Sequence, residues 1–252
     1  MREDSTRYYE NHVHSLRQSS LNFRVQSVLS SGILNSCNIG AITGLRVAEV
    51  GPGFGFLGSE IVKQGGAYLG IEPTESLRSY LAANAPTLKV INASLPNLSD
   101  LPSEASHSFD VVIAHHVIEH APTSPEALAW LAGLKTLARP GGMIAIIVPD
   151  IDSYGKYFWS CDYTHSTAFS RASLEALMRD AGLERVKVQR TRFGRSSLIV
   201  RTGLRVVRCF FPIGAVDLLT HRWLGYPLGT GIATAALLAS LVAVAEAPSS
   251  PE

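Results

Sequence analysis

The chain has 252 residues, and its 22 Lys and Arg nearly balance its 21 Asp and Glu, so the formal net charge is +1. No basic tract is interleaved with aromatic residues, which argues against nucleic acid as a partner. Its length suits one sizeable core, and we expect a single domain over residues 1–252. Three widely spaced cysteines (Cys37, Cys161 and Cys209) and a polar N-terminus without the apolar core of a secretion signal indicate a reducing, cytoplasmic setting.

Residues 1–40 precede the first strong strand pattern. Apolar positions between residues 16 and 29 recur at roughly helical spacing, so we expect one or two lid-like helices before a core at 41–193. A helix that simply packs on the sheet is the alternative. Four aromatic or imidazole side chains would project from such a lid and could close over a ligand: Tyr8, Tyr9, His12 and His14.

An apolar strand at residues 45–50 runs directly into a turn that contains Gly51, Gly53 and Gly55. Glycines adopt positive φ and lack a Cβ, so this backbone can press against a ligand at the end of a central strand. Spacing from Gly53 onward also fits the dinucleotide pattern G-x-G-x-x-G. Glu49 discriminates between a dinucleotide and a ligand with a cationic amino-acid group, because an anion there would repel a pyrophosphate and suit the cation.

The pattern E-x-G-x-G-x-G at residues 49–55 resembles motif I of the class I methyltransferases. The resemblance implies that Glu49 and the glycine turn hold the methionine end of S-adenosylmethionine. A nicotinamide enzyme is the competing interpretation.

The second strand is expected at 67–71, after a helix at 57–63. Glu72 ends this strand some twenty residues past the glycine turn, where an acid accepts hydrogen bonds from ribose hydroxyls. A helix at 74–83 and a strand at 88–91 then lead to Asn92 and Ala93. The family usually has an acid at the position of Asn92, and the resemblance implies contact with the exocyclic amine of adenine. Asn92 can accept that hydrogen bond without a charge.

An apolar run at 109–114 is typical of a strand buried on both faces of a parallel sheet, and His115 follows it at the ligand crevice. A helix at 124–138, a turn at 139–142 and a strand at 143–148 come next. The run F-D-V-V-x-x-x-x-V-x-E-H, followed by x-x-P-G-G, strongly resembles the same family. This resemblance, over residues 45 to 150, implies an α/β, doubly wound, Rossmann-like sheet of seven strands in the order 3-2-1-4-5-7-6, with the last strand antiparallel.

The string D-x-x-H-x-x-x-F-S at 162–170 resembles the segment after the core of ubiquinone-biosynthesis-like O-methyltransferases. A helix at 171–181, capped by Ser170, and a strand at 183–191 should follow. Histidine suits removal of a hydroxyl proton near neutral pH, so His165 is the candidate general base. Asp162 could orient His165 or hold the substrate, and His120 is a further catalytic candidate. The alternative role of His165 is to fix its loop onto the core.

His116, Glu119 and His120 are spaced three and four residues apart at the start of a helical segment, so they can share a face around a divalent ion. The matching string in ubiquinone-type O-methyltransferases is E-x-x-E-H, and the resemblance implies a metal that polarises the substrate hydroxyl. Histidine in place of the first Glu favours Zn²⁺ or another transition metal over Mg²⁺. Bracing of the loop by Glu119 and His120 is the alternative. The H-x-x-E-H spacing of certain zinc peptidases also matches, but here it follows a buried strand.

Residues 194–238 are expected to insert one or two helices before a last strand at 239–247. No charged residue occurs from 224 to 245, which is long enough to raise a transmembrane helix. Small residues dominate that stretch, which also contains Pro227. Because the sheet still lacks its seventh strand, we expect the strand and no membrane association.

These features predict an S-adenosylmethionine-dependent methyltransferase that acts on an oxygen of a small natural product, quinone-like compound or sugar and releases S-adenosylhomocysteine. A homodimer is a further expectation. The alternative is a catalytically inactive, S-adenosylmethionine-binding regulatory or scaffold protein associated with a membrane pathway.

Overall fold

The computed structural model describes residues 30–98, 101, 105–191 and 238–249. Residues 30–36 are helical, in agreement with a helix before the core. The four side chains expected on a lid and the insertion expected at 194–238, except its last residue, lie outside the described residues.

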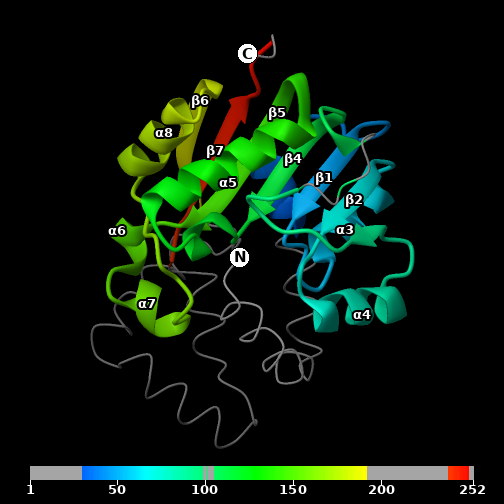
Figure 1. Cartoon of the computed structure of the whole chain (residues 1–252), viewed down its shortest axis with the longest axis horizontal. Helices are drawn as coiled ribbons and strands as arrows, with labels where there is room; N and C mark the ends of the chain where they lie inside the picture. Colours follow the sequence, from blue (N-terminus) through cyan, green and yellow to red (C-terminus); the bar gives the residue numbers. More distant parts are fainter. Residues whose placement is uncertain (1–29, 99–100, 102–104, 192–237, 250–252) are drawn as a thin grey trace, which may run out of the picture.

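A seven-stranded sheet in the order β3-β2-β1-β4-β5-β7-β6 forms the centre of the protein (Figure 1). Adjacent strands from β3 to β5 are parallel, and β7 is antiparallel to both of its neighbours. This arrangement confirms the predicted fold. The strands are β1 (Arg46–Val50), β2 (Ala67–Ile71), β3 (Val90–Ile91), β4 (Phe109–His115), β5 (Ala138–Pro149), β6 (Glu184–Thr191) and β7 (Ser240–Glu246).

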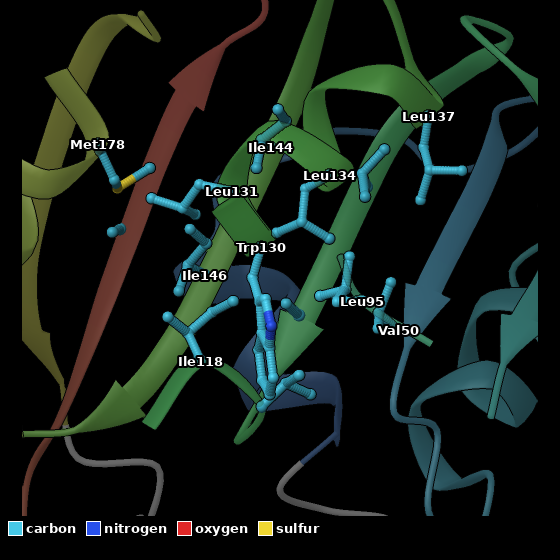
Figure 2. Close-up of a cluster of buried hydrophobic side chains, with 14 of the residues drawn as sticks. Val50, Leu95, Ile118, Trp130, Leu131, Leu134, Leu137, Ile144, Ile146 and Met178 are labelled. Carbon is cyan, nitrogen blue, oxygen red and sulfur yellow. The ribbon is translucent and has the colours of Figure 1, made fainter. Parts of the chain in front are cut away.

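Helices cover both faces of the sheet because its central strands are apolar on both sides. In β4, Val112 and Ala114 belong to one hydrophobic cluster while Val111 and Ile113 belong to another. Figure 1 shows α5 across β4 and β5, and Figure 2 shows Leu131 and Leu134 of that helix beside Ile144 and Ile146 of β5. The second face packs against residues 30–36 and α3. The helices are α3 (Phe56–Lys63), α4 (Glu75–Asn84), the 3-10 turn η2 (Ile118–His120), α5 (Ser124–Leu137), α6 (Ile151–Tyr154), α7 (Tyr157–Cys161) and α8 (Arg171–Asp180).

Strand β5 starts earlier than the sequence suggested. Residues 139–142 were expected to form a turn, but β5 begins at Ala138, which pairs with Phe109, and the register shifts before Val111. Gly142 has no room for a side chain, because a Cβ there would lie 2.8 Å from the carbonyl oxygen of Arg139 and 2.9 Å from that of Phe109. The glycine pair therefore marks a strand irregularity at close backbone contact.

The end of the C-terminal apolar run forms strand β7. Residues of β7 pair with β5 on one side and β6 on the other, and most are buried. This confirms the predicted last strand. Among the helices of the described ranges, none is both long and apolar enough to cross a membrane.

The loop that follows β5 is held at both ends. Asp150 pairs with Phe169 in an isolated parallel bridge. Ser170 caps α8 as predicted, since its hydroxyl accepts the backbone N–H of Ser173 and the Ser173 hydroxyl accepts the N–H of Ser170. Residues 151–169 are thereby kept at the carboxyl end of the parallel strands.

Candidate active site

A pocket of about 330 Å³ opens at the carboxyl ends of β1, β2 and β4. A pocket of this size suits a small-molecule ligand, and in parallel α/β sheets this is the usual edge for one. Of the predicted site residues, Glu49, Gly51, Gly53, Glu72, His115, His116 and His120 line it; the remaining lining residues are Ser30, Ile33, Val50, Pro52, Phe54, Phe56, Leu57, Pro73, Leu77, Ser94, Leu95, Val117 and Trp130.

Glu49 is a buried carboxylate on β1. Burial raises its pKa to about 7, although the Tyr68 hydroxyl, which donates to Oε2 at 2.7 Å, opposes the rise. Tyr68 lies on the neighbouring strand β2, where it pairs with Val47, and it is held in place by packing, since a Cβ on Gly58 would come within 2.5 Å of its ring. The folded chain thus holds an acid whose charge is poorly compensated, and a cationic ligand group would compensate it.

Glu72 is the second buried acid of the pocket. Its Oε1 accepts the backbone N–H of Thr74 at 2.9 Å, and burial raises its pKa. Arg78 of α4 donates from Nη1 to the Glu72 carbonyl at 2.9 Å and to Oδ1 of Asn92 at 3.2 Å. Asn92 is therefore oriented with its amide oxygen toward Arg78. Neither Asn92 nor Ala93 lines the pocket, although their neighbours Ser94 and Leu95 do.

Two glycines of the turn, Gly53 and Gly55, are needed for different structural reasons. A Cβ on Gly53, at φ +53°, would meet no atom within 4 Å, so this residue leaves open space at the pocket. A Cβ on Gly55 would lie 2.6 Å from Leu81 and 2.8 Å from Leu88. Gly55 is thus required for packing against α4 and the following loop, and it does not line the pocket, in contrast to the role expected for it.

The histidines that follow β4 differ in environment. His115 is half-buried, and desolvation of its ring lowers its pKa to about 3 and keeps the ring neutral. His116 has φ 55° and directs Nδ1 to Oε1 of Glu119 at 2.8 Å. Glu119 is fully buried; burial raises its pKa, but the hydrogen bond to His116 and the neighbouring histidines outweigh this and lower it overall. Its Oε2 has no hydrogen-bond partner among the described residues.

His120 is oriented by a chain of hydrogen bonds. Asp162 Oδ1 accepts from the Thr164 hydroxyl at 2.6 Å, and the Thr164 oxygen lies 2.9 Å from Nδ1 of His120. Since the single hydroxyl proton goes to Asp162, His120 must donate from Nδ1 and carry its lone pair on Nε2. Burial lowers the pKa of His120, so the ring is neutral. The Asp162 side chain therefore orients His120 through Thr164, while its carbonyl accepts the backbone N–H of His165 at 3.3 Å.

His165 is buried against the ring of Phe158, with ring centroids 4.7 Å apart. Its Nδ1 lies 2.8 Å from the Phe158 carbonyl oxygen, which can only accept, so Nδ1 carries the proton and Nε2 the lone pair. The backbone N–H groups of Ser166 and Thr167 both donate to the Glu119 carbonyl, at 2.9 and 3.0 Å. This ties the loop after β5 to η2, and the His120 and His165 rings lie 5.0 Å apart.

The structure gathers a triad different from the predicted metal set. Potential ligand atoms of Glu119, His120 and His165 all lie within 4.8 Å of one another, and all three residues are buried. His116 was predicted in place of His165, but in the described part of the chain it is a hydrogen-bond partner of Glu119 and not a member of this group.

Sequence reasoning overlooked Tyr68, Thr164 and Trp130. Thr164 carried a weak signal, because it lies between Asp162 and His165 in the quoted string, whereas Tyr68 and Trp130 look like ordinary strand and helix residues. Their contacts with the site come from neighbouring elements: Tyr68 binds Glu49 across β1 and β2, and Trp130 lines the pocket from α5.

Comparisons with known proteins match this chain to methyltransferases. A family model described as a methyltransferase domain matches residues 24–188. The ubiquinone biosynthesis O-methyltransferase of Rhizobium etli is 26% identical over 105 residues, which is 42% of this chain and 41% of the relative. The chain thus spans about two fifths of the length of the first curated relatives it matches.

Two solved structures share the fold. A S-adenosylmethionine-dependent methyltransferase from Archaeoglobus fulgidus superposes with a TM-score of 0.60 at 16% identity, covering 95% of this chain and 99% of that one. The Burkholderia thailandensis 1,6-didemethyltoxoflavin-N1-methyltransferase, solved with bound 1,6-didemethyltoxoflavin and S-adenosylhomocysteine, gives a TM-score of 0.59 at 15% identity, covering 98% of this chain and 89% of that one. At these identities the likeness concerns the fold alone.

Proposed function

The chain belongs to the methyltransferase domain family, and on that premise we propose that it transfers a methyl group from S-adenosylmethionine to a hydroxyl oxygen of a small molecule. The family match confirms the class I methyltransferase resemblance, and with it S-adenosylmethionine as the cofactor. The acceptor and the atom methylated are the part we propose.

The pocket suits this cofactor. When bound, S-adenosylmethionine supplies both the methyl group and its leaving group, so the protein must position the acceptor and remove a proton. The buried Glu49 carboxylate complements an ammonium group, and Glu72 complements ribose hydroxyls. This complementarity supports the assignment of both acids as cofactor residues together with Gly51, Gly53 and His115.

One observation supports the proposal that the methyl group goes to an oxygen. The pocket that holds the two acids also extends to His120, whose neutral ring has its lone pair on Nε2. His165 has the same tautomer beside it. Two imidazoles prepared to accept a proton fit a hydroxyl acceptor, which needs deprotonation, better than an amine, which needs little help beyond alignment. The names of the curated relatives agree with this choice.

The reaction then runs as an in-line displacement. The hydroxyl proton passes to an imidazole Nε2, the new O–CH₃ bond forms as the S–CH₃ bond breaks, and the electron pair of the broken bond stays on sulfur. The products are the methyl ether and S-adenosylhomocysteine. Asp162 and Thr164 are positioning residues in this scheme, because they hold the His120 tautomer through the hydrogen bonds described above.

The test is release of S-adenosylhomocysteine with a panel of catechol, quinol and sugar acceptors, alongside calorimetric titration of S-adenosylmethionine. His120→Asn keeps a donor near the place of Nδ1 and removes Nε2, so turnover should fall about 10²–10⁴-fold while cofactor affinity is retained. Cofactor binding without turnover on any acceptor would favour the non-catalytic alternative. Full activity of both His120→Asn and His165→Asn would exclude histidine-assisted O-methylation.

A further inference from the structure

Three buried side chains from two separate segments converge beside the pocket, and of these His120 lines it. Glu119 and His120 come from η2, and His165 comes from the loop after β5. Their potential ligand atoms lie within 4.8 Å of one another, although 45 positions separate His120 from His165 in the sequence. Such a gathering of one carboxylate and two imidazoles requires a physical reason.

Glu119 is incompletely satisfied. Its side chain is fully buried, Oε1 is bound by His116, and Oε2 finds no hydrogen-bond partner in the described part of the chain. A buried carboxylate oxygen without a partner is costly, and native structures usually satisfy such an atom with a donor, a water or a cation. His116 meanwhile fixes the orientation of the carboxylate group.

Both imidazoles have the arrangement typical of metal-bound histidines. His120 donates from Nδ1 to Thr164, which is bound to Asp162, and His165 donates from Nδ1 to the Phe158 carbonyl. Metal-ligating histidines nearly always donate their second ring N–H to a carboxylate, a carbonyl or a similar acceptor, which fixes the tautomer and makes the ligating nitrogen more basic. In both residues here the lone pair is on Nε2.

The two segments are already tied together. Besides the two N–H groups that donate to the Glu119 carbonyl, the Thr167 hydroxyl donates to the carbonyl of Ala121 at 2.6 Å. The triad is therefore built into the folded chain.

We propose that Glu119, His120 and His165 hold one divalent transition-metal ion of the zinc class, with His116 supporting Glu119 from outside the coordination shell. Two imidazoles and one carboxylate form a ligand set that suits zinc-class ions, whereas Mg²⁺ prefers oxygen ligands. Three protein ligands leave a position open. Its role in catalysis rests on the proposed function: when bound, the ion would supply Lewis acidity that lowers the pKa of an acceptor hydroxyl. Because it would occupy Nε2 of both histidines, the hydroxyl proton would then pass to solvent instead of to an imidazole.

The test measures metal binding directly, without the reaction. Tag-free full-length protein is stripped with a chelator, and ZnCl₂ and MgCl₂ are titrated separately by calorimetry in the absence of S-adenosylmethionine. Two matched variants discriminate the ligand sets. Asparagine places an amide donor near the position of Nδ1, so His116→Asn preserves the bond to Glu119 and His165→Asn preserves the bond to Phe158, while each removes Nε2. His116 has φ 55°, which asparagine tolerates.

We expect one Zn²⁺ per chain in the wild type, a change of less than about tenfold in His116→Asn, and a loss of more than about 100-fold in His165→Asn, beyond the effect of a supporting residue. Loss in His116→Asn with retention in His165→Asn would overturn the ligand set. Binding unchanged by both variants would mark adventitious surface zinc, and preference for Mg²⁺ or no binding would also refute the site.

Two controls keep these outcomes interpretable. Titration of S-adenosylmethionine into each stripped variant shows whether the fold is retained, and failure of the wild type to bind the cofactor would count against the proposed function alone. Should His165→Asn not fold, an anomalous difference map of zinc-loaded wild-type crystals identifies the ligands, and density away from His165 would refute the proposal.

Discussion

The buried acid at the end of β1 makes the stability of the ligand-free protein depend on pH. Burial raises the pKa of Glu49 from 4.5 to about 7. Below pH 4.5 the carboxyl is protonated in both the folded and unfolded chain and has no effect. Between these values the unfolded chain releases the proton while the folded chain retains it, so the free energy of unfolding falls as pH rises.

The size of this effect follows from the shift. At about 1.36 kcal/mol per pKa unit, Glu49 should lower the free energy of unfolding by about 3 kcal/mol between pH 4.5 and pH 8. Glu49→Gln removes the titration and retains an oxygen that can accept from Tyr68. His115 and His120, whose pKa values are lowered, titrate in both proteins, so the difference between wild type and variant isolates Glu49.

The assay is urea denaturation of the ligand-free wild type and Glu49→Gln from pH 5 to 8, with Glu75→Gln, a change of an exposed carboxylate, as the control. The stability of wild type relative to Glu49→Gln should decline by about 2.5 kcal/mol across this range, while Glu75→Gln follows wild type. S-adenosylmethionine affinity of the wild type should rise over the same range, because the ligand cation needs the carboxylate. Parallel curves for wild type and Glu49→Gln would refute the argument.

Three further predictions concern the pocket and the sheet. Glu72→Ala should weaken S-adenosylmethionine binding by about 1–3 kcal/mol in a calorimetric titration, since a hydrogen-bonding partner is lost, and nicotinamide dinucleotides should not compete; tight NADH binding without S-adenosylmethionine binding would contradict it. Gly55→Ala should lower the free energy of unfolding by more than about 1 kcal/mol, because the new Cβ combines φ +76° with a 2.6 Å contact to Leu81; an unchanged melting temperature would show that the turn adapts. Deleting residues 239–252 should leave an insoluble protein, because β7 joins β5 to β6; a soluble, active truncated enzyme would disprove this.

Much of the fold could be predicted because its determinants are local. Apolar runs that end at a glycine, an acid or a histidine predicted β1, β2 and β4, and the serine at 170 predicted the start of α8. The last strand at 240–246 was also predicted, because an apolar run that will be buried can be recognised in the sequence even when its partner strands cannot. Where a local pattern was ambiguous, as at the glycine pair before residue 143, the prediction of a turn was wrong, because pairing with β4 extends the strand.

The arrangement of the candidate site was decided by tertiary structure. Sequence motifs identified Glu49, Glu72 and the histidines as candidate site residues. A motif, however, determines contacts only between residues a few positions apart. The sheet order brings Tyr68 to Glu49 across two strands, and the backbone bonds from the loop after β5 to η2 bring Thr164 and His165 to His120. Contacts over such sequence distances depend on how the strands are ordered and how the loops close, which is why the sequence did not show that Asp162 reaches His120 through Thr164 or that His165 lies near Glu119.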